Sequence, residues 1–250
     1  MCRLLGWVAP RPTTLSRLLG DDLDAFTRLA VKHGDGWGVA TPRADGVDVV
    51  KAPDSARTSP RFAALARDHE VDTAVVHLRW ATLGLPAEPG NTHPFTDGRI
   101  AFAHNGSISP PSSLDPLVAP DLLAARDGTT DSERYFLALR TRLRTSPGPL
   151  EALGATVRDI SALHHSSLNA MLVTPDTLYA VCRWQEAAEA AEEEEDYYRL
   201  HYKVQDGAVV VASSGFGTGW QHLADGEVLE VARATGEVRV HAVHDLAQAA

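Results

Sequence analysis

The sequence predicts an α+β domain built in layers, with two mainly antiparallel sheets. Its segments follow the order strands, then helices, then strands, and the last group begins near Ser167. Asp-Gly pairs at 206–207 and 225–226 separate the late strands and are turn signals. No repeat and no linker divides the 250 residues, so we expect one domain over residues 1–250.

The first strand is predicted over residues 2–9, where leucine, tryptophan and valine supply the apolar side chains. Pro10 and Pro12 are expected to end this strand, because proline lacks the backbone N–H. A helix with an acidic first turn is predicted to begin near Asp21 and to stop at Gly34.

Three glycines surround Asp35 and Trp37 in the segment 34–38. This pattern predicts a tight turn into a strand, at a place where the backbone passes close to another group. A simple turn would give the same pattern.

The other elements follow in chain order. Ser59 suits a helix cap and Pro60 suits a first turn, so they predict a helix that runs to about Glu70. Residues 185–196 are rich in alanine and glutamate and are expected to form a solvated helix or a mobile acidic insertion. The remaining predicted elements are a hairpin turn at 43–46 and strands at 47–50, 71–80, 99–104, 168–173, 178–183, 197–204, 208–212, 227–232 and 237–241. Residues 116–145 are predicted to be helical, with Asp131 and Glu133 in the first turn of a second segment, and residues 149–163 are predicted to form a further helix.

Composition argues against several classes of partner. The formal net charge of −10 argues against nucleic acid and against an anionic membrane surface, since both bind basic faces. No apolar run reaches the ~20 residues that span a bilayer, and the N-terminus lacks the pattern of a signal peptide. Cys2 and Cys182 make no disulfide framework, so we expect a cytoplasmic protein with free thiols. The eleven histidines show no metal-ligand spacing, so no metal site and no cofactor is predicted.

Cys2 is the candidate nucleophile. Removal of Met1 would leave a residue that carries a thiol and a free α-amine on the same carbon. Their ordinary pKa values are ~8.5 and ~7.7–8.0, so the amine can accept the thiol proton near neutral pH. The alternative is an apolar filler of the first strand, because free cysteine is among the most buried residue types.

Asn105 and Gly106 are the candidate oxyanion donors. Attack of a thiol on an amide creates a tetrahedral oxyanion that needs hydrogen-bond donors, and the loss of one donor costs ~10²–10³ in rate. The Asn105 side-chain amide and the Gly106 N–H can converge on one oxygen. The same pair would also make a common turn.

A substrate with an amino-acid head needs a cation for its carboxylate and an anion for its ammonium group. Arg79 offers a bidentate fork for the carboxylate, and Asp131 offers a charge for the ammonium. Thr82 and His93, in the adjoining loop, could add hydrogen-bond donors. The structural alternatives are a surface ion pair for Arg79, a turn residue for Thr82, a hydrogen-bonded loop histidine for His93 and a helix cap for Asp131.

Six motifs occur in an order that is typical of one family. They are Cys2, Gly-Asp-Gly-Trp-Gly at 34–38, His-Leu-Arg-Trp-Ala-Thr at 77–82, Asn-Thr-His-Pro-Phe at 91–95, His-Asn-Gly at 104–106 and Thr-Asp-Ser-Glu at 130–133. Together they resemble the class II glutamine amidotransferase domains over residues 2 to about 135. These domains are N-terminal-nucleophile (Ntn) hydrolases, which implies a four-layer αββα sandwich.

The resemblance implies a role for each candidate. Cys2 would attack the γ-carbonyl of glutamine or of a γ-glutamyl group and form a thioester, with its own amine as base and then as acid. The Asn105 side chain and the Gly106 N–H would form the oxyanion hole. The other implied roles are the α-carboxylate for Arg79, the α-ammonium for Asp131, and the lining of the glutamine-side loop for Trp80 and Thr82.

Two departures separate the chain from the members that make glucosamine-6-phosphate. Those relatives carry Arg-Gly-Tyr-Asp-Ser-Ala-Gly where this chain has Lys-His-Gly-Asp-Gly-Trp-Gly at 32–38, and they carry histidine where this chain has Leu83. The glycine-rich segment, the Met-Cys-Arg start and the segment 94–98 resemble a stand-alone branch instead. That branch includes the ergothioneine-pathway amidohydrolase, which removes glutamate from γ-glutamyl-hercynylcysteine sulfoxide.

Three functions are consistent with these residues. The first is a stand-alone amidohydrolase that cleaves a small-molecule γ-glutamyl substrate. The second is a glutaminase subunit that delivers ammonia to a separate synthase partner, since we expect the family domain to take up the whole chain. The third is a binding module without turnover, which the intact set of candidate residues argues against.

Overall fold

The structure is a computed structural model, and it describes residues 2–28, 34–80, 88–189, 197–213 and 218–246. Within these ranges the strands form two sheets in which every pairing is antiparallel. The α+β class with two mainly antiparallel sheets is therefore confirmed. The seven-stranded sheet has the order β11 (Gln221–His222), β9 (His201–Gln205), β10 (Ala208–Ala212), β1 (Arg3–Thr13), β4 (Val71–Leu78), β2 (Trp37–Pro42), β3 (Val47–Ala52).

The second sheet has six strands in the described ranges. Their order is β13 (Val238–Ala242), β12 (Glu227–Ala232), β8 (Thr177–Cys182), β7 (Asn169–Val173), β6 (Ala101–Asn105), β5 (Phe95–Thr96). The helical segments are α1 (Leu15–Leu19), α2 (Asp22–Arg28), α3 (Pro60–Asp68), η2 (Pro89–Asn91), η3 (Pro111–Leu117), α4 (Pro120–Ala124), α5 (Asp131–Leu143), α6 (Pro149–Ser161), α7 (Glu186–Glu189) and α8 (Val243–Leu246). No helix in the described ranges has the length and apolarity needed to cross a membrane.

The two faces of β1 supply two different apolar layers, because successive strand residues point to opposite sides of a sheet. Leu4 and Val8 pack between the two sheets, against side chains of β6, β7 and β8. Leu5 and Trp7 face outward and pack against α1, α2 and α3. The first strand is therefore buried on both sides.

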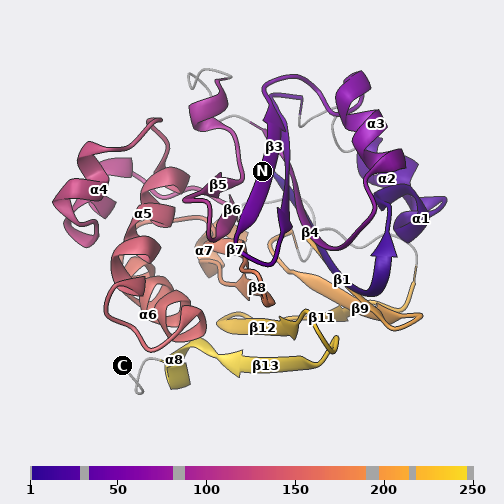
Figure 1. Cartoon of the computed structure of the whole chain (residues 1–250). Helices are drawn as coiled ribbons and strands as arrows, with labels where there is room; N and C mark the ends of the chain where they lie inside the picture. Colours follow the sequence, from indigo (N-terminus) through magenta and orange to yellow (C-terminus); the bar gives the residue numbers. More distant parts are fainter. Residues whose placement is uncertain (1, 29–33, 81–87, 190–196, 214–217, 247–250) are drawn as a thin grey trace.

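The six-stranded sheet has a matching arrangement. Phe102 and Leu172 point away from the other sheet and pack against α5 and α6. The layers therefore run α1–α3, seven-stranded sheet, six-stranded sheet, α5–α6, and Figure 1 shows the two groups of helices on opposite sides of the molecule. This is the four-layer αββα sandwich that the sequence resemblance implied.

Two predicted strand boundaries are wrong. Pro10 and Pro12 do not end the first strand, which runs to Thr13; between Val8 and Thr13 the strand loses its register with β4, so the missing proline N–H groups are not needed. The strand predicted at 197–204 begins only at His201. Before that point the backbone bonds to side chains of the other sheet instead of a neighbouring strand.

The helical region predicted at 116–145 falls within η3, α4 and α5, and its second segment is confirmed as α5, whose first turn holds Asp131 and Glu133. Pro120 begins α4 at the first helical position, where a proline without an N–H is tolerated, and Pro116 lies inside the short helix η3. The helix predicted at Ser59 is confirmed: Ser59 caps α3 by accepting a hydrogen bond from the Phe62 N–H. Residues 29–33, at the end of the predicted helix before Gly34, lie outside the described ranges, as do residues 190–196 of the acidic segment.

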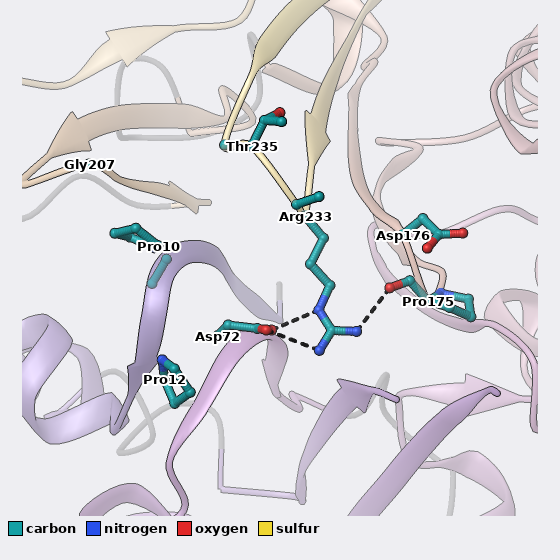
Figure 2. Close-up of a pocket in the computed structure, with 11 residues that line it drawn as sticks. Pro10, Pro12, Asp72, Pro175, Asp176, Gly207, Arg233 and Thr235 are labelled. Atoms are coloured by element: carbon teal, nitrogen blue, oxygen red, sulfur yellow. Dashed lines mark hydrogen bonds and ion pairs between the residues drawn. The ribbon is translucent and has the colours of Figure 1, made fainter. Parts of the chain in front are cut away.

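An ion pair joins the two sheets at the end away from Cys2. Arg233, after β12, donates from Nε and Nη2 to the two Asp72 carboxylate oxygens at 2.8 and 3.0 Å, and from Nη1 to the Pro175 carbonyl at 3.0 Å. Figure 2 shows this guanidinium between Asp72 and Pro175, in a cleft of about 430 Å³ that Pro10 and Pro12 also line. The contact links β4 of one sheet to the β7–β8 turn of the other.

We expect the Asp72–Arg233 pair to contribute measurably to stability. Its side chains are 25% and 30% exposed, and a bidentate pair of this kind couples by about 1 kcal/mol. A double-mutant cycle of D72A and R233A, followed by urea unfolding, measures this coupling. The matched control is Glu237–Arg239, whose side chains are more than half exposed and for which we expect less than about 0.5 kcal/mol. Equal coupling in the two cycles would contradict the assignment.

Candidate active site

Cys2 lies at the start of the central strand β1, between two neighbouring strands. Arg3 pairs with Leu78, so Cys2 stands beside the residues that follow β4. The Trp80 N–H donates to Cys2 Sγ at 3.3 Å, and the thiol lies 3.5 Å from the Trp80 carbonyl oxygen. On the other side, the Leu4 N–H donates to Ser213 Oγ at 2.9 Å. The nucleophile candidate is thus held by a buried strand.

The environment of Cys2 differs from that of the second cysteine. Burial raises the pKa of the Cys2 thiol above its ordinary value, while the Trp80 N–H and the Arg79 guanidinium act in the opposite direction. Asp131 is also close enough to raise the pKa of this thiol. Cys182 is fully buried, and burial raises the pKa of its thiol to about 12. Of the two thiols, only Cys2 is partly exposed.

Arg79 is buried, so it is not the side chain of a surface ion pair. Its Nη1 donates to the Asp35 carbonyl oxygen at 3.2 Å, and its own N–H donates to the Gly36 carbonyl at 2.8 Å. Gly36 has φ +145°, a conformation that side chains rarely adopt. The glycine-rich segment therefore holds the guanidinium next to Cys2, a role that we did not assign to Asp35 and Gly36 from the sequence.

Asn105 is the last residue of β6, and Gly106 directly follows the strand and does not form a two-residue hairpin with it. Asn105 is 1% exposed, and its Oδ1 has no hydrogen-bond partner within the described part of the chain. A Cβ at position 106 would lie 1.9 Å from the Ser167 carbonyl oxygen, so only glycine fits there. His104 fixes the same place: Nε2 donates to the Ser167 carbonyl at 3.0 Å, and Nδ1 accepts from Ser132 Oγ at 2.9 Å.

Asp131 is the first residue of α5, and its neighbour caps the helix. Thr130 Oγ1 accepts a hydrogen bond from the Glu133 N–H at 3.1 Å, so Thr130 and not Asp131 is the cap. Asp131 Oδ2 accepts from the Ile108 N–H at 2.7 Å instead. This bond ties the start of α5 to the segment that follows Gly106. A carboxylate in the first turn is also favoured by the helix dipole.

His93 lies in a cluster of rings with His77 and Phe95. Its ring centroid is 4.1 Å from that of His77 and 4.6 Å from that of Phe95. Its ring nitrogens have no hydrogen-bond partner within the described residues. Burial, with a smaller contribution from His77, holds the pKa of His93 well below its ordinary value, so the ring is neutral. A Cβ at Gly38 would lie 2.1 Å from the His93 carbonyl oxygen, so β2 packs directly against this segment.

The two remaining predicted site residues are Trp80 and Thr82, and only Trp80 belongs to the described part of the chain. Trp80 is 44% exposed, which is unusual for a tryptophan in this molecule, and it borders Cys2 through its backbone. Thr82 lies outside the described residues.

Two buried side chains brace the loop before α5. Glu133 accepts from the N–H groups of Asp127 and Gly128 at 2.7 and 2.8 Å, and Asn91 Oδ1 accepts from the Thr129 N–H at 3.0 Å. Asn91 and Glu133 entered the sequence analysis only as members of motifs, because nothing local reveals which backbone groups they bind. In the described residues no group of three or more histidine, cysteine, aspartate or glutamate side chains is placed to hold a metal ion.

Comparison with known proteins gives consistent matches. The family model described as "Glutamine amidotransferases class-II" matches residues 1–248. The chain is 28% identical over 244 residues to the gamma-glutamyl-hercynylcysteine sulfoxide hydrolase of Mycolicibacterium smegmatis, covering 92% of this chain and 96% of that protein. It is 30% identical over 235 residues to the probable glutamine amidotransferase DUG3 of Saccharomyces cerevisiae, covering 85% of this chain and 63% of the yeast protein.

A solved structure has the same fold. The glutamine aminotransferase class-II domain protein from Silicibacter pomeroyi superposes with a TM-score of 0.66 at 20% identity. The match covers 96% of this chain and all of that chain. The sandwich described above is therefore shared over nearly its full extent.

The buried histidines are expected to make the protein less stable in acid. The folded-state pKa of His93 lies well below its ordinary value and that of His104 is also lowered, in both cases chiefly because burial disfavours the charged ring. Below about pH 6.5 the unfolded chain binds these protons and the folded protein does not. The free energy of unfolding then falls with pH by up to ~1.4 kcal/mol per unit for each such histidine.

Urea unfolding between pH 7 and pH 5 measures this slope. We expect H93F to show a shallower slope than the natural sequence, because one buried titrating ring is gone. The control variant is H244Q, which removes an exposed histidine. The same slope in H93F would mean that His93 is protonated in the folded protein.

Proposed function

The chain belongs to the class II glutamine amidotransferases, a family of enzymes, and we propose that it cleaves γ-glutamyl amide bonds through a thioester at Cys2. The observation that carries this proposal is the convergence of the candidates at one end of the sandwich. Arg79 and Asp131 both act on the Cys2 thiol, and Asp131 is bonded to the segment that follows Gly106. These charges suit the two ends of an amino-acid head.

The reaction would begin with transfer of the thiol proton to the α-amine of Cys2, once Met1 has been removed. The sulfur attacks the γ-carbonyl carbon, and the oxyanion accepts hydrogen bonds from the Asn105 side chain and the Gly106 N–H. The intermediate then expels the amine, which takes the proton, and leaves a thioester. Water attacks the thioester, releases glutamate and restores the thiol.

The glutamyl head would be held by charge on both sides. Arg79 binds the α-carboxylate, and its contact with the Asp35 carbonyl fixes the guanidinium. Asp131 binds the α-ammonium. Trp80 and Thr82 would line the substrate side of this site, while the buried His93 would support it through its ring contacts with His77 and Phe95. A catalytic thiol of this kind suits the reducing cytoplasm, where we place the enzyme.

The similarity to the Mycolicibacterium enzyme makes γ-glutamyl-hercynylcysteine sulfoxide a candidate substrate of this chain. The second candidate function is a glutaminase subunit that supplies ammonia to a synthase partner. The two are separated by glutamine turnover: a synthase partner should stimulate it in the second case only.

We expect Cys2→Ala to lower glutamate release from γ-glutamyl amides by more than ~10³-fold, because the attacking sulfur is lost. The assay is a panel of γ-glutamyl amides that includes glutamine. Diazo-oxo-norleucine should label Cys2 and leave the buried Cys182 unmodified, as read by peptide mass spectrometry. C182A serves as the control and should keep both turnover and labelling. Turnover that survives in C2A would remove Cys2 from the mechanism.

Asp131→Asn should raise the KM for γ-glutamyl substrates by about 30-fold or more, because the substrate ammonium loses its charged partner. The asparagine oxygen can still accept the Ile108 N–H, so the melting temperature should change little. D127N, in the exposed loop before the same helix, is the matched control and should leave the KM unchanged. Equal KM values for D131N and the natural sequence would refute the ammonium assignment.

A further inference from the structure

Two histidine side chains meet at one edge of the seven-stranded sheet. His201 begins β9, His222 ends β11, and the two residues stand directly opposite each other in the antiparallel ladder. Their Nδ1 atoms lie 2.9 Å apart, and their ring centroids lie 4.9 Å apart. The two residues are 21 positions apart in the chain, so no local ligand spacing marks them in the sequence. The pairing of β11 with β9 brings them together (Figure 1).

The strand register shows on which side of the sheet this pair lies. His201 stands opposite Ala212 of β10, and Ala212 stands opposite Leu5 of β1. Directly opposite residues point to the same side of a sheet, and both Leu5 and Ala212 belong to the outer apolar layer. The two histidines therefore point to the outer side of the sheet. Since β10 lies between β9 and β1, they occupy a place separate from Cys2.

The distance between the two nitrogens matches that of two ligands on one metal ion. Imidazole nitrogen binds a divalent transition metal at ~2.0–2.1 Å. Two such ligands are then about 2.9–3.4 Å apart when the angle at the metal lies between ~90° and ~109°. His201 is half-buried and His222 is exposed, so a small rotation of the rings can turn both lone pairs toward one ion. Solvent can reach the same ion and supply further ligands.

The chemistry of the pair favours a transition metal over other cations. Neutral imidazole is a good ligand for Zn²⁺, Ni²⁺ and Cu²⁺, whereas Mg²⁺ and Ca²⁺ prefer oxygen ligands. Without a metal ion, the two neutral rings can share a single N–H···N hydrogen bond. Protonation of both rings would place two like charges directly opposite each other, which is unfavourable. The arrangement is therefore best satisfied by neutral rings, the form that binds a metal.

A metal ion at this place would fasten a weakly held strand. β11 has only two residues, and its ladder with β9 consists of the pairs His222–His201 and Gln221–Tyr202. The Tyr202 hydroxyl adds one hydrogen bond to Gln221 Oε1 at 2.9 Å. A metal that joins residues far apart in the chain closes a long loop, and closure of this kind stabilises a fold.

We propose that His201 and His222 form a two-histidine site for a divalent transition-metal ion that fastens β11 to β9. Water completes the coordination, because no third histidine, cysteine or carboxylate of the described ranges joins the two rings in a cluster. The ion is structural and takes no part in the chemistry at Cys2. The site therefore stands whether or not the chain cleaves γ-glutamyl amides.

The test is a titration of the full chain, without an affinity tag, with NiCl₂, followed by calorimetry and by thermal unfolding. Ni²⁺ is the probe because imidazole suits it, and the Cys2→Ala background removes the accessible thiol as a competing ligand. We expect one ion per chain. At a free Ni²⁺ concentration of ~100 times the Kd, the melting temperature should rise by about 5–10 °C.

His201→Gln and His222→Gln, each made in the same background, should weaken Ni²⁺ binding by more than about 10-fold and remove most of the rise in melting temperature. H244Q removes an exposed histidine outside the pair, and it should keep both the binding and the rise. Each variant removes one ligand from a different strand, so either one that folds decides the question.

Two results would overturn the proposal. The first is a Cys2→Ala protein whose melting temperature does not respond to Ni²⁺, which would leave the histidine pair with its hydrogen bond alone. The second is one-to-one binding that persists in H201Q and H222Q, which would place the ion elsewhere.

Discussion

The antiparallel pairing of β1 with β4 is the interaction on which the candidate site depends. Arg3 stands opposite Leu78, and this register puts Cys2 beside the Arg79–Trp80 segment. A shift of one residue would turn every side chain of β1 to the other face and would exchange the inter-sheet and outer apolar layers. Chain ends are usually poorly ordered, but this one begins a strand that is buried on both sides. The core of the sandwich thereby holds the candidate nucleophile in place.

Close backbone approach is the second constraint. At Gly38 the strand β2 passes the His93 carbonyl, and at Gly106 the end of β6 passes the Ser167 carbonyl. A side chain at either position would overlap backbone atoms that have no room to move. The close packing of β2 against His93, and of the candidate oxyanion turn against Ser167, therefore requires glycine at both positions. The backbone contacts at Gly38 and Gly106 therefore determine both how the sheets pack and where the candidate site residues lie.

Several charged side chains of the site have little exposure to solvent, and each is held by a specific contact. Arg79 donates to the backbone carbonyl of Asp35, and Asp131 accepts from the backbone N–H of Ile108, so each charged group is fixed by a backbone contact. Arg3 has a tyrosine ring as its recorded contact. The desolvation cost of a buried charged side chain is offset when a bound ligand supplies the opposite charge.

The sequence by itself determined the fold class, the αββα layers through the family resemblance, the capped helix at Ser59 and the candidate nucleophile. These follow from local patterns: alternation, caps, and the order of short motifs. Only the tertiary structure decided that Thr130 caps α5, that Asp131 binds the Ile108 N–H, and that the first strand continues past Pro12. It also decided that Arg3 is buried on the outer side of its sheet. Each of these depends on strand register and on partners far away in the chain, which no local pattern contains.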